Sequence, residues 1–268
     1  MRFGERTRSG TAVTGWTQRN IKTATTPVHF LVVAGGGGSG TGVAEQFGCG
    51  GAGGLRTSYG ATGGGGVTQT PIVVTADGST TYTVTVGAGG AAGAQGSSSV
   101  FSSVSTTGGG HGGTVRGGAG GNGGSGGGGG DFGGLGGSGT ANEGFAGGTG
   151  QGNSPTPFTD AGAGGGAGSA ATGSATRGAG LSNSITGTAV TYAQGGITTD
   201  TAGATNRGNG AGTTSGTASN AGGSGIVVLR YSYLYRISVG AGLTATTSRD
   251  GAFFVTSFTA GTGSVTFA

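Results

Sequence analysis

Short runs of apolar and β-branched residues alternate along the chain with long tracts in which glycine predominates. The two clearest apolar runs cover residues 28–34 and 226–235. Continuous apolar runs of this length, bounded by glycine, are typical of strands that are buried on both faces. We expect these two runs to pair with each other and to close the domain from its two ends.

Weaker β patterns occur between and after these two runs. They predict a hairpin of 71–75 with 81–86, a short strand at 98–105, a weak strand pair within 181–192, and a final hairpin of 252–258 with 264–267. Apolar residues nowhere recur at the i, i+3, i+4, i+7 positions of a helix face without an interrupting glycine, so we expect no α-helix.

The glycine tracts repeat every three residues. Residues 117–131 read Gly-Gly-Ala, Gly-Gly-Asn, Gly-Gly-Ser, Gly-Gly-Gly and Gly-Gly-Asp. A period of three fits neither an α-helix nor a β-strand. It does fit a polyproline-II helix, whose backbone groups point outward and can pair with neighbours where glycine allows close approach. The expected fold class is therefore all-β with glycine-rich polyproline-II tracts, in which strands at the domain ends close a stack of extended segments.

Composition narrows the class of protein. The chain has 268 residues, of which 75 are glycine and only four are proline, so a collagen is excluded. A disordered linker would carry more charge than 7% and fewer β-branched residues. Because ordering glycine costs more conformational entropy than ordering any other residue, we expect stability to come from backbone hydrogen bonds, from the strands and from association with other chains.

Three regions can be distinguished along the chain. Residues 1–27 form a polar, arginine-bearing N-terminal arm, residues 28–235 the glycine-rich domain, and residues 236–268 a C-terminal β-hairpin segment. The arm holds Trp16, and the sequence leaves open whether this arm is a flexible terminus or an anchor on another protein. We expect no membrane span, because no run of 18 apolar residues occurs, and we see no signal peptide.

The sequence does not favour an enzyme. His29 and His111 stand apart, the acidic residues are scattered, and no cluster has the spacing of metal ligands. Gly-x-Gly-x-x-Gly recurs too often to be informative and never opens a predicted helix. The only cysteine, Cys49, is expected to be a small buried side chain. No cofactor or metal is therefore expected. We expect no nucleic-acid partner either, because a net charge of +4 is too dilute for a nucleic-acid-binding surface.

Five blocks occur in a fixed order: 30–38 (Phe-Leu-Val-Val-Ala followed by glycines), 50–55, 82–90, 184–192 and 222–231. In that order they resemble the glycine-rich domain of phage tail fibres and related adhesins. The resemblance implies a non-enzymatic structural protein of a phage virion, in the particle or extracellular. Its implied partners are itself, other virion proteins and a host-surface receptor. Some phage adhesins of similar composition pack polyproline-II helices side by side.

The C-terminal segment departs from the family. A segment similar to 251–267 usually precedes the first block there, but here it ends the chain. It could fold back within its own chain, supply strands to the edge of 28–34 in the next subunit, or begin a second, truncated domain. Strand donation by residues 249–268 would join chains head to tail, so the alternative function is a subunit of a self-assembling extracellular filament. An ice-binding protein is a third class, which the irregular threonine spacing disfavours.

Two sets of residues are candidates for contacts with other molecules. The candidates for assembly are Trp16, Phe30, Leu31, Val32, Val33, Ile226, Val228, Phe253, Phe254, Val255, Phe258, Val265 and Phe267. Exposed tips are expected at 56–66 and 151–160, where Tyr59 and Phe158, together with Phe145, would contact a receptor.

Overall fold

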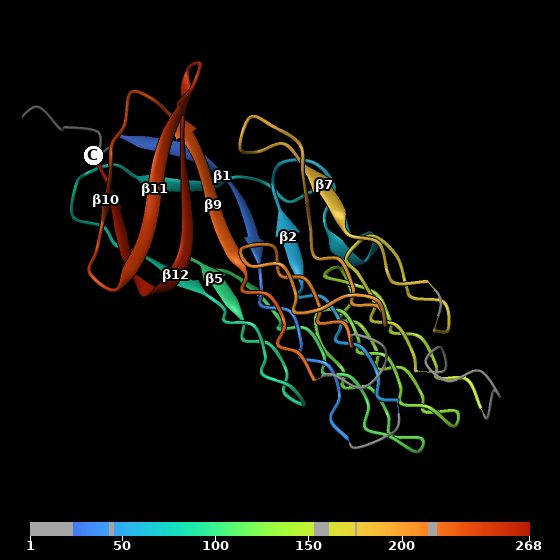
Figure 1. Cartoon of the computed structure of the whole chain (residues 1–268). Coiled ribbons are helices and arrows are strands. Elements are labelled where there is room, and N and C mark those ends of the chain that lie inside the picture. Colours follow the sequence, from blue (N-terminus) through green and yellow to red (C-terminus); the bar gives the residue numbers. More distant parts are fainter. Residues whose placement is uncertain (1–23, 43–45, 153–160, 175, 214–218) are drawn as a thin grey trace, which may run out of the picture.

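The structure is a computed structural model that describes residues 24–42, 46–152, 161–174, 176–213 and 219–268. Within these residues the chain is all-β, as predicted, and a single 3₁₀ turn at η1 (Gly63–Gly65) is its only helical element. Figure 1 shows a strand-rich region at one end, from which the glycine tracts run out to a far end, turn and come back. The N-terminal arm up to residue 23, with Trp16, and Phe158 lie outside the described residues.

The strands are short except for four, β1, β9, β11 and β12. They are β1 (Thr25–Val33), β2 (Leu55–Thr57), β3 (Ile72–Thr75), β4 (Tyr82–Val86), β5 (Ser99–Phe101), β6 (Val104–Thr106), β7 (Leu181–Asn183), β8 (Val190–Tyr192), β9 (Ile226–Ser232), β10 (Ile237–Val239), β11 (Leu243–Asp250) and β12 (Phe253–Phe267).

One sheet contains all of these strands except β7 and β8. Its main order is β2-β1-β9-β12-β4-β5-β6, with β3 added to β1 and with β10 and β11 added to β12. The sheet bends into a nearly closed barrel, and β7 and β8 form a separate two-stranded sheet beside it. The predicted pairing of 28–34 with 226–235 is confirmed, because β1 and β9 pair antiparallel from His29 opposite Arg230 to Val33 opposite Ile226.

Residues 30–33 of β1 and 226–231 of β9 are buried on both faces, as their continuous apolar sequences predicted, whereas Thr25 and Pro27 at the start of β1 are exposed. Phe30 and Val32 point into the barrel together with Phe258 and other side chains of β4, β5, β9 and β12. Leu31 and Val33 point the other way, into a second core beneath β2 and the β7–β8 sheet. The alternation of side chains along a strand therefore gives β1 one core on each face.

Three details of the expected pairing are wrong. β3 pairs with β1 instead of β4, since β4 is taken by β12 on one edge and β5 on the other. The expected single strand at 98–105 is a hairpin of β5 and β6 that turns at Ser102, where φ is 52°. The expected final hairpin is one continuous strand, β12, whose partner is β11; a register shift between Thr244 and Ala245 keeps the glycine-containing stretch of β12 within the ladder.

The C-terminal segment lies in the sheet of its own chain. β12 pairs with β9 through residues 253–258 and with β4 through residues 261–265. Phe258, Val265 and Phe267 are fully buried in the barrel core. In the described chain the segment thus folds back on the domain that precedes it.

Candidate functional site

The glycine tracts form a lattice held together by backbone hydrogen bonds. Successive N–H groups of residues 48–54 donate in turn to three different tracts, 107–113, 162–165 and 208–211, and the same tract recurs every third residue. Carbonyl oxygens of 48–54 accept from three further segments, at 34–40, at 125–128 and at Gly196. A threefold alternation is the period of a polyproline-II helix, and that helix type stays our interpretation of it. The tract at 48–54 is thus surrounded by six neighbours.

Close approach within the lattice requires glycine at defined positions. A Cβ atom on Gly50 would lie 2.0 Å from the carbonyl oxygen of Gly37, and one on Gly53 would lie 2.1 Å from that of Ala34. Real Cβ atoms essentially never come this near to a backbone oxygen. At these positions the tracts therefore contact one another through their backbones. The positions of the glycines determine which segments can pack together.

Cys49 and Ala52, three residues apart, carry the side chains of this central tract. Both are completely buried, which agrees with the small buried cysteine that the sequence predicted. The Cys49 Sγ atom lies 3.9 Å from Thr213 Oγ1, and burial raises the pKa of the thiol to about 12. A thiol that stays protonated at neutral pH is a poor nucleophile and a poor metal ligand, so its place here is structural.

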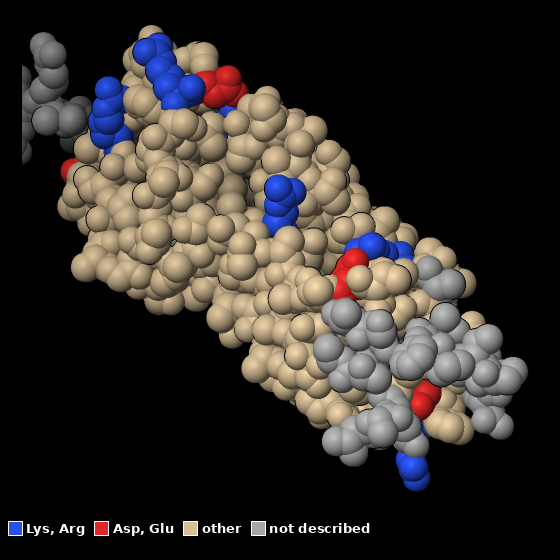
Figure 2. Space-filling model, viewed as in Figure 1, with Lys and Arg blue, Asp and Glu red and all other residues tan. Residues whose placement is uncertain are grey.

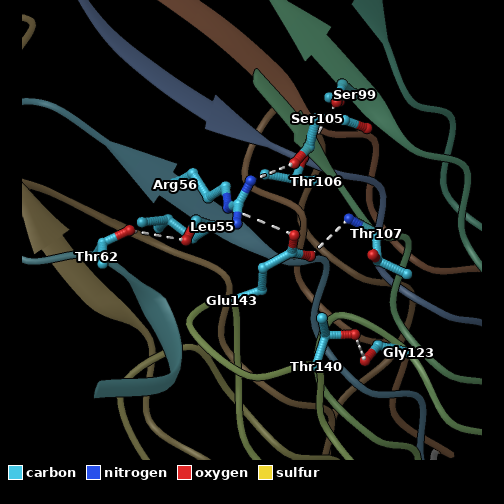
Figure 3. Close-up of polar contacts among 10 residues, drawn as sticks. All are labelled: Leu55, Arg56, Thr62, Ser99, Ser105, Thr106, Thr107, Gly123, Thr140 and Glu143. Atoms are coloured by element: carbon cyan, nitrogen blue, oxygen red, sulfur yellow. Dashed lines mark hydrogen bonds and ion pairs between the residues drawn. The ribbon is translucent and has the colours of Figure 1, made fainter. Parts of the chain in front are cut away.

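An ion-paired network connects the lattice to the barrel (Figure 3). Glu143, which lies in the turn at 141–143 and is 5% exposed, accepts a hydrogen bond at Oε2 from the Thr107 N–H at 2.7 Å. Its Oε1 lies 3.6 Å from Arg56 Nε of β2, and Arg56 Nη1 donates to the Ser105 carbonyl of β6 at 3.4 Å. β2 and β6 end the main strand order, so Arg56 bridges the seam at which the barrel nearly closes.

A second ion pair lies on β9. Arg230 is 9% exposed, donates to Asp250 Oδ2 at 2.6 Å, and stacks over the ring of Phe253 at 4.5 Å. Tyr59, one of the expected receptor contacts, lies 5.7 Å from the same guanidinium and edge-on to His29. The signal in the sequence was an arginine inside an otherwise apolar strand, which requires a partner when buried.

The candidate assembly residues have two different placements. Those that are buried in the cores of their own chain are Phe30, Leu31, Val32, Val33, Ile226, Val228, Val255, Phe258, Val265 and Phe267. Phe254 is half-buried and Phe253 is 37% exposed, so only these two are available at the surface of the described chain. Trp16 lies outside the described residues.

The expected receptor contacts are not brought together at one exposed tip. Residues 55–57 form β2, and Thr57, Ser58, Thr62 and Gly63 of the expected tip are buried. Phe145 is half-buried, and most of the expected tip at 151–160 lies outside the described residues. The glycine-rich sequence at 56–66 is typical of an exposed loop. In the structure part of this segment is instead buried against the second core.

A polar hollow of about 350 Å³ lies beside the lattice and is lined in part by Arg177, Gln194, Asp200 and Asn209. Arg177 and Asp200 form an ion pair, and the Asn209 side-chain oxygen accepts from the Gln194 N–H at 3.2 Å. These polar groups thus bond to one another. Most of the surface visible in Figure 2 carries no charged side chain.

The described residues contain no group of three or more histidine, cysteine, aspartate or glutamate side chains placed to hold a metal ion. Among the same residues, no helix has the length and hydropathy needed to cross a membrane.

Comparison with known proteins identifies a family. A family model described as a glycine-rich domain matches residues 11–232, which is most of the chain. No curated protein and no solved structure matches the sequence.

Proposed function

We propose that the chain, which belongs to the glycine-rich domain family, is a non-enzymatic structural protein of a phage virion. It would form part of a tail fibre, an adhesin or another appendage. The observation that carries the proposal is the lattice, in which a tract such as 48–54 bonds through its backbone to neighbours on all sides. A lattice of this kind gives the protein a defined shape and exposes few reactive side chains.

The order of the five sequence blocks supports the phage part of the proposal, since it is the order in which the tail-fibre and adhesin domains carry similar blocks. The lattice supports the structural part. An adhesin would also need variable contact points, and turns between tracts can supply them. At one such turn Phe132 is 53% exposed, and Leu135 just after it is 66% exposed.

The test is whether the protein is a component of the particle. Mass spectrometry of phage particles purified from the source should detect the chain in a constant ratio to the capsid protein. Immunogold labelling with an antibody against the chain should decorate one kind of appendage. A chain that is absent from purified particles, yet present in the lysate, contradicts the proposal.

The filament alternative, with head-to-tail donation of residues 249–268, has less support. Both edges of β1 already have partners, with β9 on one and β2 on the other along 31–33, so no open edge remains there for a donated strand. Donation would also remove Phe258, Val265 and Phe267 from the barrel core. Fully burying one such side chain is worth about 1.5–3 kcal/mol, so an opened chain would be strongly destabilised until a neighbour replaced the strand.

A further inference from the structure

β10 and β11 form the outer edge of the C-terminal ribbon. Val265 of β12 pairs with both Tyr82 and Val239, and residues 253–258 pair with both β9 and β11. A residue that pairs with two strands has one on each side, so β10 and β11 share the edge of β12 that faces away from β9 and β4. Within the described part of the chain, β11 pairs with β12 alone.

The free edge of β11 is open to solvent. Thr246, Thr247, Ser248 and Arg249 are consecutive and all exposed. Because successive side chains of a strand point to opposite faces, four exposed residues in a row mean that both faces are uncovered there. Figure 1 shows the tip of the β11–β12 hairpin projecting beyond the neighbouring strands.

The other edge strands of the main sheet are shorter than β11. β2, β6 and β10 have three residues each, β3 has four, and Arg56 of β2 bridges to β6. β11 has eight residues, and its first six contain no proline and no charge. Its ladder with β12 has one register shift, between Thr244 and Ala245, and is regular from Ala245 to Asp250. A long edge strand with few charges and no proline is a template for pairing with another strand.

We propose that β11 pairs antiparallel with β11 of a second copy of this chain, so that two barrels join into one continuous sheet around a twofold axis. The axis would pass close to Thr247, which places Thr246 opposite Ser248 of the other copy. Hydroxyl pairs are favourable across antiparallel strands, and this register puts Arg249 opposite Ala245, so no like charges meet. A twofold contact also gives a closed dimer, in which the free β11 edges of both copies are paired.

This inference goes beyond the proposed function by naming a surface and a partner for self-association. It makes no use of the virion assignment. A dimer in solution and presence in a particle are separate measurements, so each proposal can fail alone.

The experiment uses the full-length chain and two charge variants. In Thr246→Lys/Ser248→Lys, lysines of the two copies would face each other across the proposed pair, and Thr246→Glu/Ser248→Glu would do the same with carboxylates. Both substituted residues are exposed, so the variants should fold. A matched control, Thr83→Lys/Ser103→Lys, places the same charge at exposed positions in β4 and beside β5.

Sedimentation velocity at about 100 µM detects dimers with a Kd below about 10 µM. We expect the unsubstituted chain and the control to sediment as dimers, with twice the mass of 24.7 kDa. Each charge variant alone should sediment as a monomer. An equimolar mixture of the Lys and Glu variants should sediment as a dimer again. Recovery in the mixture separates pairing across this edge from a general loss of stability. A monomeric unsubstituted chain, an assembly that the Lys variant leaves intact, or a mixture that stays monomeric overturns the inference.

Discussion

The Cα atom of Gly50 faces the carbonyl oxygen of Gly37 so closely that a Cβ atom on Gly50 would stand 2.0 Å from it. The same Cβ atom would lie 2.9 Å from the backbone nitrogen of Ala211. Both obstacles are backbone atoms of neighbouring tracts, and each tract is fixed by hydrogen bonds to others. At Gly50, therefore, none of these obstacles is a flexible side chain that could move aside.

Gly50→Ala should lower the free energy of unfolding by about 3 kcal/mol, at the upper end of the usual cost of overpacking. The matched control is Gly152→Ala, because among the described residues, its chain neighbours aside, no heavy atom lies within 4 Å of its Cβ position. The control should change stability by less than about 0.5 kcal/mol. Urea unfolding at one protein concentration measures both. Similar effects for the two variants would show that the close approach of the tracts does not limit stability.

Glu143 should contribute to stability in two separable ways. Glu143→Gln keeps an acceptor for the Thr107 N–H and loses the ion pair with Arg56, whose side chain is 31% exposed, so we expect a cost of about 1 kcal/mol. Glu143→Ala also leaves the Thr107 N–H without its acceptor and should cost about 2–3 kcal/mol. Chemical unfolding of both variants gives the order, and an alanine variant at least as stable as the glutamine variant would contradict it.

The sequence predicted those parts of the fold that are encoded in local pattern. The apolar runs identified β1 and β9 and their pairing. The alternation of hydrogen-bond partners along 48–54 has the same period of three as the glycine tracts. Pattern failed for β11, whose Leu-Thr-Ala-Thr-Thr-Ser sequence has no regular apolar face because much of the strand is exposed on both sides. The predicted hairpin of 71–75 with 81–86 also failed, because β3 and β4 pair with different partners.

The neighbours of each tract could not be predicted, since glycine has no side chain to record what it touches. In the tract at 48–54, the small side chain of Cys49 indicated that the tract is buried. Glu143 was one carboxylate in a glycine-rich stretch, and nothing near it in the sequence indicates Arg56 or Thr107. Arg230 could be detected as a cation in an apolar strand. Its partner Asp250 could not, because it lies 20 residues further along the chain, at the end of β11.

Cys49 should be unreactive in the folded chain. Burial raises the pKa of its thiol to about 12, and the thiolate is the form that attacks a disulfide reagent. At about pH 8 we expect no labelling without denaturant and one thiol per chain in denaturant. Rapid labelling of the folded chain, measured by the absorbance of the released thiol, would contradict complete burial.

The same raised pKa predicts a pH dependence. The unfolded thiol has a pKa of about 8.5, so between about pH 8.5 and 12 the unfolded chain releases a proton that the folded chain retains. Stability is therefore complete below this range and falls as the pH rises through it. Cys49→Ala should flatten that decline, leaving the part due to Tyr192 and Tyr231, whose pKa values burial also raises. Identical pH profiles for the two chains would exclude a contribution from the thiol.

A chain that ends at Ser248 should fail to form the barrel. It loses β12, which lies between β9 and β4 on one edge and β11 and β10 on the other, and with it the buried Phe258 and Phe267. Single core phenylalanines are worth about 3–5 kcal/mol each, and a domain has about 5–15 kcal/mol in total. We expect no cooperative thermal transition by circular dichroism and rapid proteolysis, whereas Phe253→Ala in the full chain, at a 37% exposed position, should still fold. A truncated chain that folds and stays soluble would instead favour residues 249–268 as a strand for a neighbouring subunit.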